Sequence, residues 1–268
     1  MITRQAPIGV FDSGIGGLTV VRELTRQLPA ERIIYFGDTA RVPYGPKSAD
    51  TVRRYSDEIT SWLADQGVKA VVVACNTATA QALPSLREKF AVPIIGVVEP
   101  GARAAVAASA THRIGVIGTQ GTIASGAYDR AIRALDLTAE ITAQPCPLFV
   151  PLVEEGWTDT EATRLIAEHY LSPLAAAKVD TLVLGCTHYP LLKPMLARVV
   201  GGGVRLIDSA EETAAETARV LDEFGLRTHA QEAPEHRFVA SDDPARFLRL
   251  GQHFLGTTIE CVEQVTLG

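Results

Sequence analysis

The sequence contains no apolar run long enough to span a membrane, and its N-terminus does not resemble a signal peptide. We therefore expect no membrane partner and a cytoplasmic location. The chain also lacks an excess of positive charge. Its formal net charge is −6, which gives no reason to expect a nucleic-acid partner. With 268 residues and no linker-like stretch, it is long enough for one large domain or two medium ones.

Cysteine is scarce, and its spacing excludes two common uses. The four cysteines are Cys75, Cys146, Cys186 and Cys261. They form no CxxC pair, and no third or fourth ligand stands at a spacing typical of zinc sites. The chain is neither small nor disulfide-dense, which favours free thiols in a reducing compartment. We therefore expect no metal, and we expect Cys146 and Cys261 to serve in packing.

Signatures of phosphate-containing cofactors are missing as well. Gly14, Gly16 and Gly17 do not have the dinucleotide-binding spacing, and no P-loop lysine follows them. None of the lysines stands where a pyridoxal phosphate site would need one. The glycine-rich turn can cradle a phosphate, or it can let a helix start close to a ligand. Asp12 beside it would repel phosphate but bind an ammonium group. We expect no cofactor.

The sequence does contain short apolar segments that alternate with amphipathic helices. Ser48 to Gln66 is the clearest helix, with Ser48 as its N-cap and Gly67 beyond its end. Strands that are apolar on both faces and alternate with helices indicate an α/β fold with parallel sheets. The predicted strands are Ile8–Phe11, Ile33–Phe36, Ala70–Ala74, Pro93–Val97, Ile114–Ile117, Thr181–Leu184, Val204–Ile207 and Arg237–Ala240.

Three of these strand ends recur in the same order about 110 residues later, which indicates an internal duplication. IGVFDSGIGG resembles IGVIGTQGT, VVVACNTAT resembles TLVLGCTHY, and PIIGVVEPG resembles VRLIDSAEE. We predict two pseudo-symmetric domains, each a mostly parallel sheet flanked by helices, with the active site in the cleft between them. The first domain comprises residues 1–98 and 208–268, and the second comprises residues 99–207.

Cys75 and Cys186 occupy equivalent strand ends in the two repeats, so the duplication predicts that two thiols face each other across the cleft. A thiol has a pKa near ~8.5, and modest help from its neighbours would make it a base at neutral pH. A single buried cysteine is commonly an apolar filler. Two at matched strand ends, each followed by polar residues, favour a catalytic pair.

The other polar residues of the predicted cleft suit an amino acid. Asp12 can hold a cation, and Tyr44 with Gly45 can close over a ligand. Asp38 is either a turn former or part of the site, and Trp157 is either core or cleft wall. Hydroxyl and amide groups that can bind carboxylates come from Ser13, Asn76, Thr77 and Thr187. Two thiols around such a ligand would reach its Cα–H bond from both faces.

The chain resembles the cofactor-independent aspartate/glutamate racemases over nearly its whole length. The matching stretches are GVFDSGIGGLTV, YFGDTARVPYG, VACNTATA, GVVEPG and VLGCTHYPLL. The resemblance implies a two-base mechanism in which Cys75 acts on the D-enantiomer and Cys186 on the L-enantiomer. It also implies that Asp12 assists Cys75, and that His188 assists Cys186 with Glu154 as its orienting carboxylate. Substrate contacts would come from Asp12, Ser13, Tyr44, Gly45, Asn76, Thr77, Thr187 and His188.

The resemblance further implies glutamate as the substrate, a role in supplying D-glutamate for peptidoglycan, and a homodimer. A racemase of another acidic amino acid, such as aspartate, is the alternative within this chemistry. A two-domain amino-acid-binding protein without catalysis is the alternative from another class, but it has no need for matched thiols. From the residues alone, His188 can also be a cap at a helix start, and Glu154 is expected in a polar loop.

Overall fold

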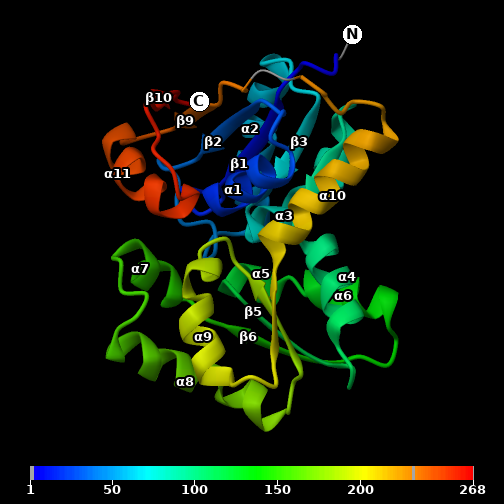
Figure 1. Ribbon diagram of the computed structural model, residues 1–268, viewed down its shortest axis with the longest axis vertical. Coiled ribbons are helices and arrows are strands. Elements are labelled where there is room, and N and C mark those ends of the chain that lie inside the picture. The colour runs from blue at the N-terminus through cyan, green and yellow to red at the C-terminus, as the bar shows by residue number, and fades with distance from the viewer. Residues whose placement is uncertain (1–2, 231–232, 268) are drawn as a thin grey trace.

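The strands of this protein form two parallel sheets, one in each half of the molecule (Figure 1). The computed structural model describes residues 3–230 and 233–267. In those ranges the larger sheet has the order β10-β9-β2-β1-β3-β4, and the smaller has the order β6-β5-β7-β8. The strands are β1 Ile8–Asp12, β2 Ile33–Gly37, β3 Ala70–Val73, β4 Ile94–Gly96, β5 Arg113–Gly118, β6 Glu140–Pro145, β7 Thr181–Gly185, β8 Arg205–Asp208, β9 Arg237–Ala240 and β10 Glu263–Gln264. The predicted α/β class with parallel sheets is confirmed.

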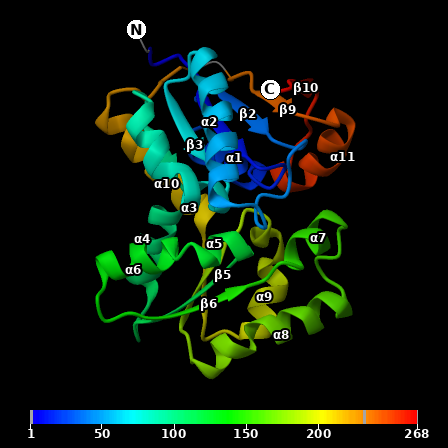
Figure 2. The same cartoon turned by 180° about the vertical axis from the view of Figure 1, so that it is seen from behind.

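Helices cover both faces of each sheet (Figures 1 and 2). The helices are α1 Leu18–Gln27, α2 Ala49–Asp65, α3 Asn76–Lys89, α4 Val98–Ala108, α5 Gln120–Ala124, α6 Ala127–Leu135, α7 Phe149–Glu154, α8 Glu161–Ala176, α9 Lys193–Val200, α10 Ser209–Glu223 and α11 Pro244–Leu255. Within the described ranges, none of them combines the length and the apolar character that a membrane crossing requires. Apolar residues of α1, α10 and α11 pack on one face of the larger sheet, and those of α2 and α3 pack on the other.

The helix predicted from Ser48 is confirmed to within one residue at each end. The Ser48 hydroxyl accepts a hydrogen bond from the Thr51 backbone N–H at 3.3 Å, as an N-cap side chain does. Gly67 follows the helix with a φ of +73°, a left-handed conformation that glycine adopts without steric cost. Ser48 and Gly67 thus mark the beginning and the end of α2, the helix that connects β2 with β3.

The two sheets repeat the same strand order, which supports the predicted duplication. Four strands of the larger sheet run β2-β1-β3-β4, and the smaller sheet runs β6-β5-β7-β8, so each of these four strands has a counterpart in the other half. Strand β6 was not predicted, because its residues are exposed or only partly buried and form no apolar run. The two-residue, exposed strand β10 was not predicted either.

The chain passes between the halves twice, after β4 and after β8. The segment after β8 returns to the larger sheet, where α10 packs beside α1 and β9 pairs with β2 (Figure 1). The domain boundaries near residues 98 and 208 stay a prediction. Because the active residues of parallel sheets stand at the carboxyl ends of their strands, these passages place one set of strand ends opposite the other.

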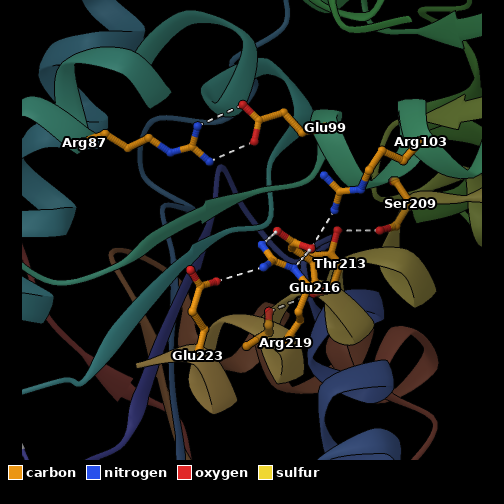
Figure 3. Close-up of polar contacts among 9 residues, drawn as sticks. Arg87, Glu99, Arg103, Ser209, Thr213, Glu216, Arg219 and Glu223 are labelled. Carbon is orange, nitrogen blue, oxygen red and sulfur yellow. Dashed lines mark hydrogen bonds and ion pairs between the residues drawn. The ribbon is translucent and has the colours of Figure 1, made fainter. Parts of the chain in front are cut away.

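Ion pairs flank both passages (Figure 3). The guanidinium of Arg87 on α3 contacts both carboxylate oxygens of Glu99 on α4, at 2.8 and 2.9 Å. Arg103 on α4 donates to Glu216 on α10 at 2.6 Å, and Arg219 donates to the same carboxylate. Since most of these side chains are exposed, each pair contributes little to stability, roughly 0–1 kcal/mol. Their geometry does tie α4 of one half to α3 and α10 of the other.

Candidate active site

Cys75 and Cys186 line one small cavity between the halves, as their positions in the two repeats predict. Its volume is about 40 Å³, room for only a few water molecules. The residues around it are Ser13, Val42, Pro43, Tyr44, Gly45, Cys75, Asn76, Thr77, Thr119, Val150, Cys186, Thr187 and His188. The structure thus brings together most of the predicted site, while Asp12 and Glu154 lie behind its wall and contact residues that line it.

Thr119 is a lining residue that the sequence analysis missed, although a signal for it existed. It stands in the second repeat where Ser13 stands in the first, in IGVIGTQGT against IGVFDSGIGG. Its hydroxyl lies 2.8 Å from that of Thr77, and its side chain caps α5 by accepting from Thr122 N–H. The repeat therefore locates polar groups on both sides of the cavity.

The two thiols are nearly buried, and this changes their acidity. Cys75 and Cys186 are each 5% exposed. Burial, together with the charge of Asp12, raises the pKa of Cys75 to about 12. Burial also raises the pKa of Cys186, and a backbone hydrogen bond from His188 offsets this only in part. Because desolvation disfavours the thiolate, the action of either thiol as a base at neutral pH stays a prediction.

Cys75 stands at the start of a helix, next to a buried carboxylate. Its sulfur accepts the Ala78 backbone N–H at 3.4 Å as the N-cap of α3, and it lies 3.8 Å from the Ser13 hydroxyl. Asp12 accepts from the Gly14 N–H at 2.9 Å and from the Thr187 hydroxyl at 3.4 Å. Burial raises the pKa of Asp12, and the charge of His188 opposes the rise.

Cys186 belongs to a chain of polar contacts that crosses between the halves. Its sulfur lies 4.0 Å from Nδ1 of His188, whose Nε2 lies 3.0 Å from Oε1 of Glu154. Arg246 on α11 donates to Oε2 of Glu154 at 3.1 Å. Burial would raise the pKa of Glu154, but the hydrogen bond and charge of His188, with the charge of Arg246, leave it lowered. His188 caps no helix with its side chain.

Around this chain of contacts, one expectation needs correction and one residue was not predicted. Glu154 does not lie in a polar loop but is the last residue of helix α7, whose start at Phe149 is buried. Arg246 was not identified from the sequence. It lies on a helix far along the chain from Glu154, and no spacing pattern links the two.

The glycine-rich turn brings the halves together. A Cβ at Gly16 would lie 2.3 Å from Thr187 Oγ1 and 2.5 Å from His188 Nδ1, distances that no side chain could keep. The Thr19 hydroxyl, one turn further on, donates to the Thr187 carbonyl at 3.0 Å. Close approach of the two halves therefore requires a glycine here.

Asp38 is more than a turn former. It is fully buried and accepts hydrogen bonds from Arg41 Nε at 2.7 Å, from the Tyr44 hydroxyl, and from the Ser241 hydroxyl at 2.8 Å. Tyr44 lines the cavity beside Gly45. Asp38 thus holds the loop that forms one wall of the cavity against the C-terminal segment.

The remaining candidates lie outside the cavity. Trp157 is 52% exposed, which excludes a core position, and it does not line the cavity that holds Cys75 and Cys186. Cys146 is buried, as expected, but Cys261 is exposed, and its assignment to packing is wrong. All four cysteines are free thiols. The described part of the chain has no group of three or more His, Cys, Asp or Glu side chains placed to hold a metal.

Comparisons with known proteins agree on one group. The family described as Asp/Glu/Hydantoin racemase matches residues 8–217. A glutamate racemase from Geobacter metallireducens is 54% identical over 97% of this chain and 96% of its own length. The crystal structure of glutamate racemase isoform RacE1 from Bacillus anthracis has a TM-score of 0.95 at 42% identity, covering 98% of each chain. A Francisella tularensis glutamate racemase in complex with D-glutamate has a TM-score of 0.93 at 40% identity, with the same coverage.

Proposed function

The chain belongs to the Asp/Glu/Hydantoin racemase family and is an isomerase, and from that premise we propose that it interconverts L- and D-glutamate by proton transfer between two cysteines. The observation that carries the proposal is the placement of Cys75 and Cys186. They stand at equivalent strand ends of two repeated sheets, line one cavity, and have different polar partners. A binding protein would not need two thiols so arranged.

In the L-to-D direction, the thiolate of Cys186 takes the α-proton and becomes a thiol. The electron pair of the broken C–H bond stays on the substrate as a carbanion stabilised by its carboxylate. The thiol of Cys75 then delivers its proton to the opposite face and becomes a thiolate. The D-to-L direction uses the same steps in reverse. In both directions, His188 and Glu154 assist proton transfer at Cys186, and Asp12 assists proton transfer at Cys75.

Charge on the bound substrate would lower the pKa of the two thiols. Both thiols have raised pKa values, so the unliganded enzyme holds them mainly as thiols at neutral pH. A substrate ammonium held near Asp12 would place a positive charge beside them and favour a thiolate. Carboxylates of the substrate would be bound by Ser13, Asn76, Thr77 and Thr187 and by the loop of Tyr44 and Gly45.

The proposal is tested by following the circular dichroism of L-glutamate with purified protein, after dialysis against a chelator and a carbonyl reagent. The signal should decay to zero, because the equilibrium mixture is racemic. L-Aspartate in the same assay tests the alternative acidic substrate. Thermal stabilisation by glutamate without any change of its signal would instead favour a binding protein. Activity that returns only with pyridoxal phosphate or a divalent metal would contradict a cofactor-free mechanism.

The biological role that fits this activity is supply of D-glutamate for peptidoglycan, in the cytoplasm and as a homodimer. Thiols that must stay reduced favour the cytoplasm over an oxidising compartment. Growth of a D-glutamate auxotroph should be restored by the wild-type chain and not by Cys75→Ala. Light scattering of the purified protein measures its oligomeric state, and a monomer would overturn the homodimer.

Replacement of Glu154 by glutamine is expected to slow L-to-D conversion by about 10–100-fold. The amide can still accept a hydrogen bond from His188, but it loses the negative charge that stabilises the imidazolium beside Cys186. Because the equilibrium constant of a racemisation is one, kcat/KM must fall equally in both directions. The asymmetry will instead appear in the primary isotope effect, which should grow for α-deuterated L-glutamate and shrink for the D-enantiomer.

Glu155→Gln is the matched control for this variant, because Glu155 is the exposed next residue. It should leave both rate and isotope effects unchanged. An unchanged L-to-D rate in Glu154→Gln would remove Glu154 from the mechanism.

The pH dependence should be bell-shaped, because activity needs one thiolate and one thiol. A raised pKa means that thiolate forms only as the pH increases, so the rising limb of kcat/KM should extend well above neutral pH. In kcat, which reports the complex, the bound ammonium should move that limb to lower pH. A kcat/KM that keeps climbing at strongly alkaline pH would contradict two thiols. A rising limb that lies at higher pH in kcat than in kcat/KM would contradict the effect of the bound ammonium.

A further inference from the structure

The amide of Asn76 is only half satisfied. Its Oδ1 accepts a hydrogen bond from the Tyr128 hydroxyl at 2.7 Å, and the residue is 2% exposed. Among the residues that the structure describes, its Nδ2 has no hydrogen-bond partner. Asn76 lines the cavity between Cys75 and Cys186. A buried donor without a partner is costly, so a donor kept at a cavity wall is placed for an acceptor on the ligand.

Tyr128 is held rigidly where it makes this contact. It lies on α6 in the second half, 3% exposed, within the apolar cluster that covers the smaller sheet. A Cβ at Gly185 would lie 3.0 Å from its Cε2, and one at Gly101 would lie 3.4 Å from its Cε1. The ring therefore fits between α4 and the strand end that carries Cys186. Burial raises the pKa of Tyr128, so its phenol stays protonated and remains a donor.

We propose that Tyr128 is a positioning residue that orients the Asn76 amide, so that its N–H group faces a carboxylate of the substrate. In the reversed orientation, Oδ1 would face that carboxylate, and two hydrogen-bond acceptors would repel each other. The hydroxyl of Tyr128 selects the productive orientation by donating to Oδ1 from the other side. The inference rests on the proposed function for the identity of the ligand.

The contact also joins the two half-sites. Asn76 follows Cys75 directly at the start of α3, and Tyr128 packs against Gly185, which directly precedes Cys186. The Tyr128 hydroxyl thus orients the Asn76 amide beside Cys75, while the Tyr128 ring packs against the strand end that carries Cys186. The carboxylate it serves would be held equally for both enantiomers, so the effect should be on binding rather than on either proton transfer.

The first test is Tyr128→Phe, which keeps the ring and removes one hydroxyl. KM should rise about 3- to 10-fold for both L- and D-glutamate, the range expected for loss of one hydrogen bond, while kcat changes less than about twofold. Tyr170→Phe is the control. Tyr170 is also in the second half, and its hydroxyl accepts the Leu148 N–H away from the cavity. The KM of Tyr170→Phe should equal that of the wild type. An unchanged KM in Tyr128→Phe, or a loss confined to kcat, would overturn the proposal.

The second test is a double-mutant cycle with Asn76→Ala. If Tyr128 acts through Asn76, then adding Tyr128→Phe to Asn76→Ala should raise KM by less than about twofold. An additive effect would overturn the proposal, because Tyr128 would then act through another group.

Asn76→Asp tests the orientation without altering Tyr128, so the answer does not depend on how Tyr128→Phe folds. With nitrogen facing the substrate, the aspartate places an acceptor against its carboxylate and should raise KM more than Asn76→Ala does. If KM rose less in Asn76→Asp than in Asn76→Ala, the amide oxygen would face the ligand. That result would overturn the proposal. Wild-type turnover of glutamate, measured first, separates a failure of the proposed function from a failure of this inference.

Discussion

Cys75→Ala and Cys186→Ala are each expected to lower the rate of racemisation by about 10²–10⁴-fold, the usual contribution of a positioned acid or base. Each cysteine serves one face of Cα, so losing either blocks the full reaction. Each variant should nevertheless retain proton exchange at the face of Cα that its remaining cysteine serves. Cys75→Ala keeps Cys186 and should exchange the α-proton of L-glutamate with solvent. Cys186→Ala should do the same with D-glutamate.

Deuterated solvent distinguishes this mechanism from a single base. With the wild-type enzyme, D-glutamate formed from L-glutamate should carry deuterium at Cα, while unreacted L-glutamate at first stays unlabelled. The reason is that the proton goes to Cys186 and the deuteron comes from Cys75. The measurement is mass spectrometry of the separated enantiomers in early turnovers.

Cys261→Ala is the matched control, since this thiol is exposed and away from the cavity. It should racemise and label as the wild type does. Mostly unlabelled product in early turnovers would indicate one base that returns the substrate's own hydrogen. A variant of Cys75 or Cys186 with full racemase activity would equally reject the two-thiol mechanism.

Gly16→Ala should lower kcat/KM by about 10²-fold, the loss expected when reacting groups shift by roughly 1 Å. The added methyl would lie 2.3 Å from Thr187 Oγ1 and 2.5 Å from His188 Nδ1, so either the strand end or the turn must move. One apolar cluster includes residues of both halves, so circular dichroism melting of the variant must accompany the assay and show that the loss of activity belongs to folded protein.

Gly14→Ala is the control in the same turn. Its Cβ would lie 3.4 Å from the side chain of Val42, an ordinary contact, and alanine keeps the N–H that donates to Asp12. Its activity should stay within about threefold of the wild type, because the added methyl group, although buried, meets no atom closer than an ordinary contact. Wild-type kcat/KM in Gly16→Ala would show that the halves need not approach so closely.

The sequence allowed the centre of the site to be predicted because the duplication carries positional information. Matching Cys75 to Cys186 places both at strand ends that meet, and the same match locates Thr119 opposite Ser13. The apolar strands were predicted to within one residue at each end. The polar edge strand β6 was not, because period and apolarity are the only signals that a single sequence gives for a strand.

Other properties depend on the folded environment and have no local signal. The raised pKa values of the thiols follow from burial, which residue type does not reveal for a cysteine beside polar neighbours. Arg246 and Tyr128 reach the site across long stretches of chain, through contacts with Glu154 and Asn76. Glu154 was expected in a polar loop, yet it ends helix α7.

The strand order also dictates when the larger sheet can be completed during protein synthesis. β2, whose five residues are all buried, pairs with β1 on one side and with β9 on the other. Roughly 200 residues separate β2 from β9. At translation rates of about 5–20 residues per second, this edge of β2 therefore stays unpaired for about 10–40 s after β2 is synthesised. An apolar strand with a free edge is a template for pairing with other chains. Nascent chains should therefore need a chaperone at this edge, and stop codons after β8 should give aggregated rather than merely inactive protein.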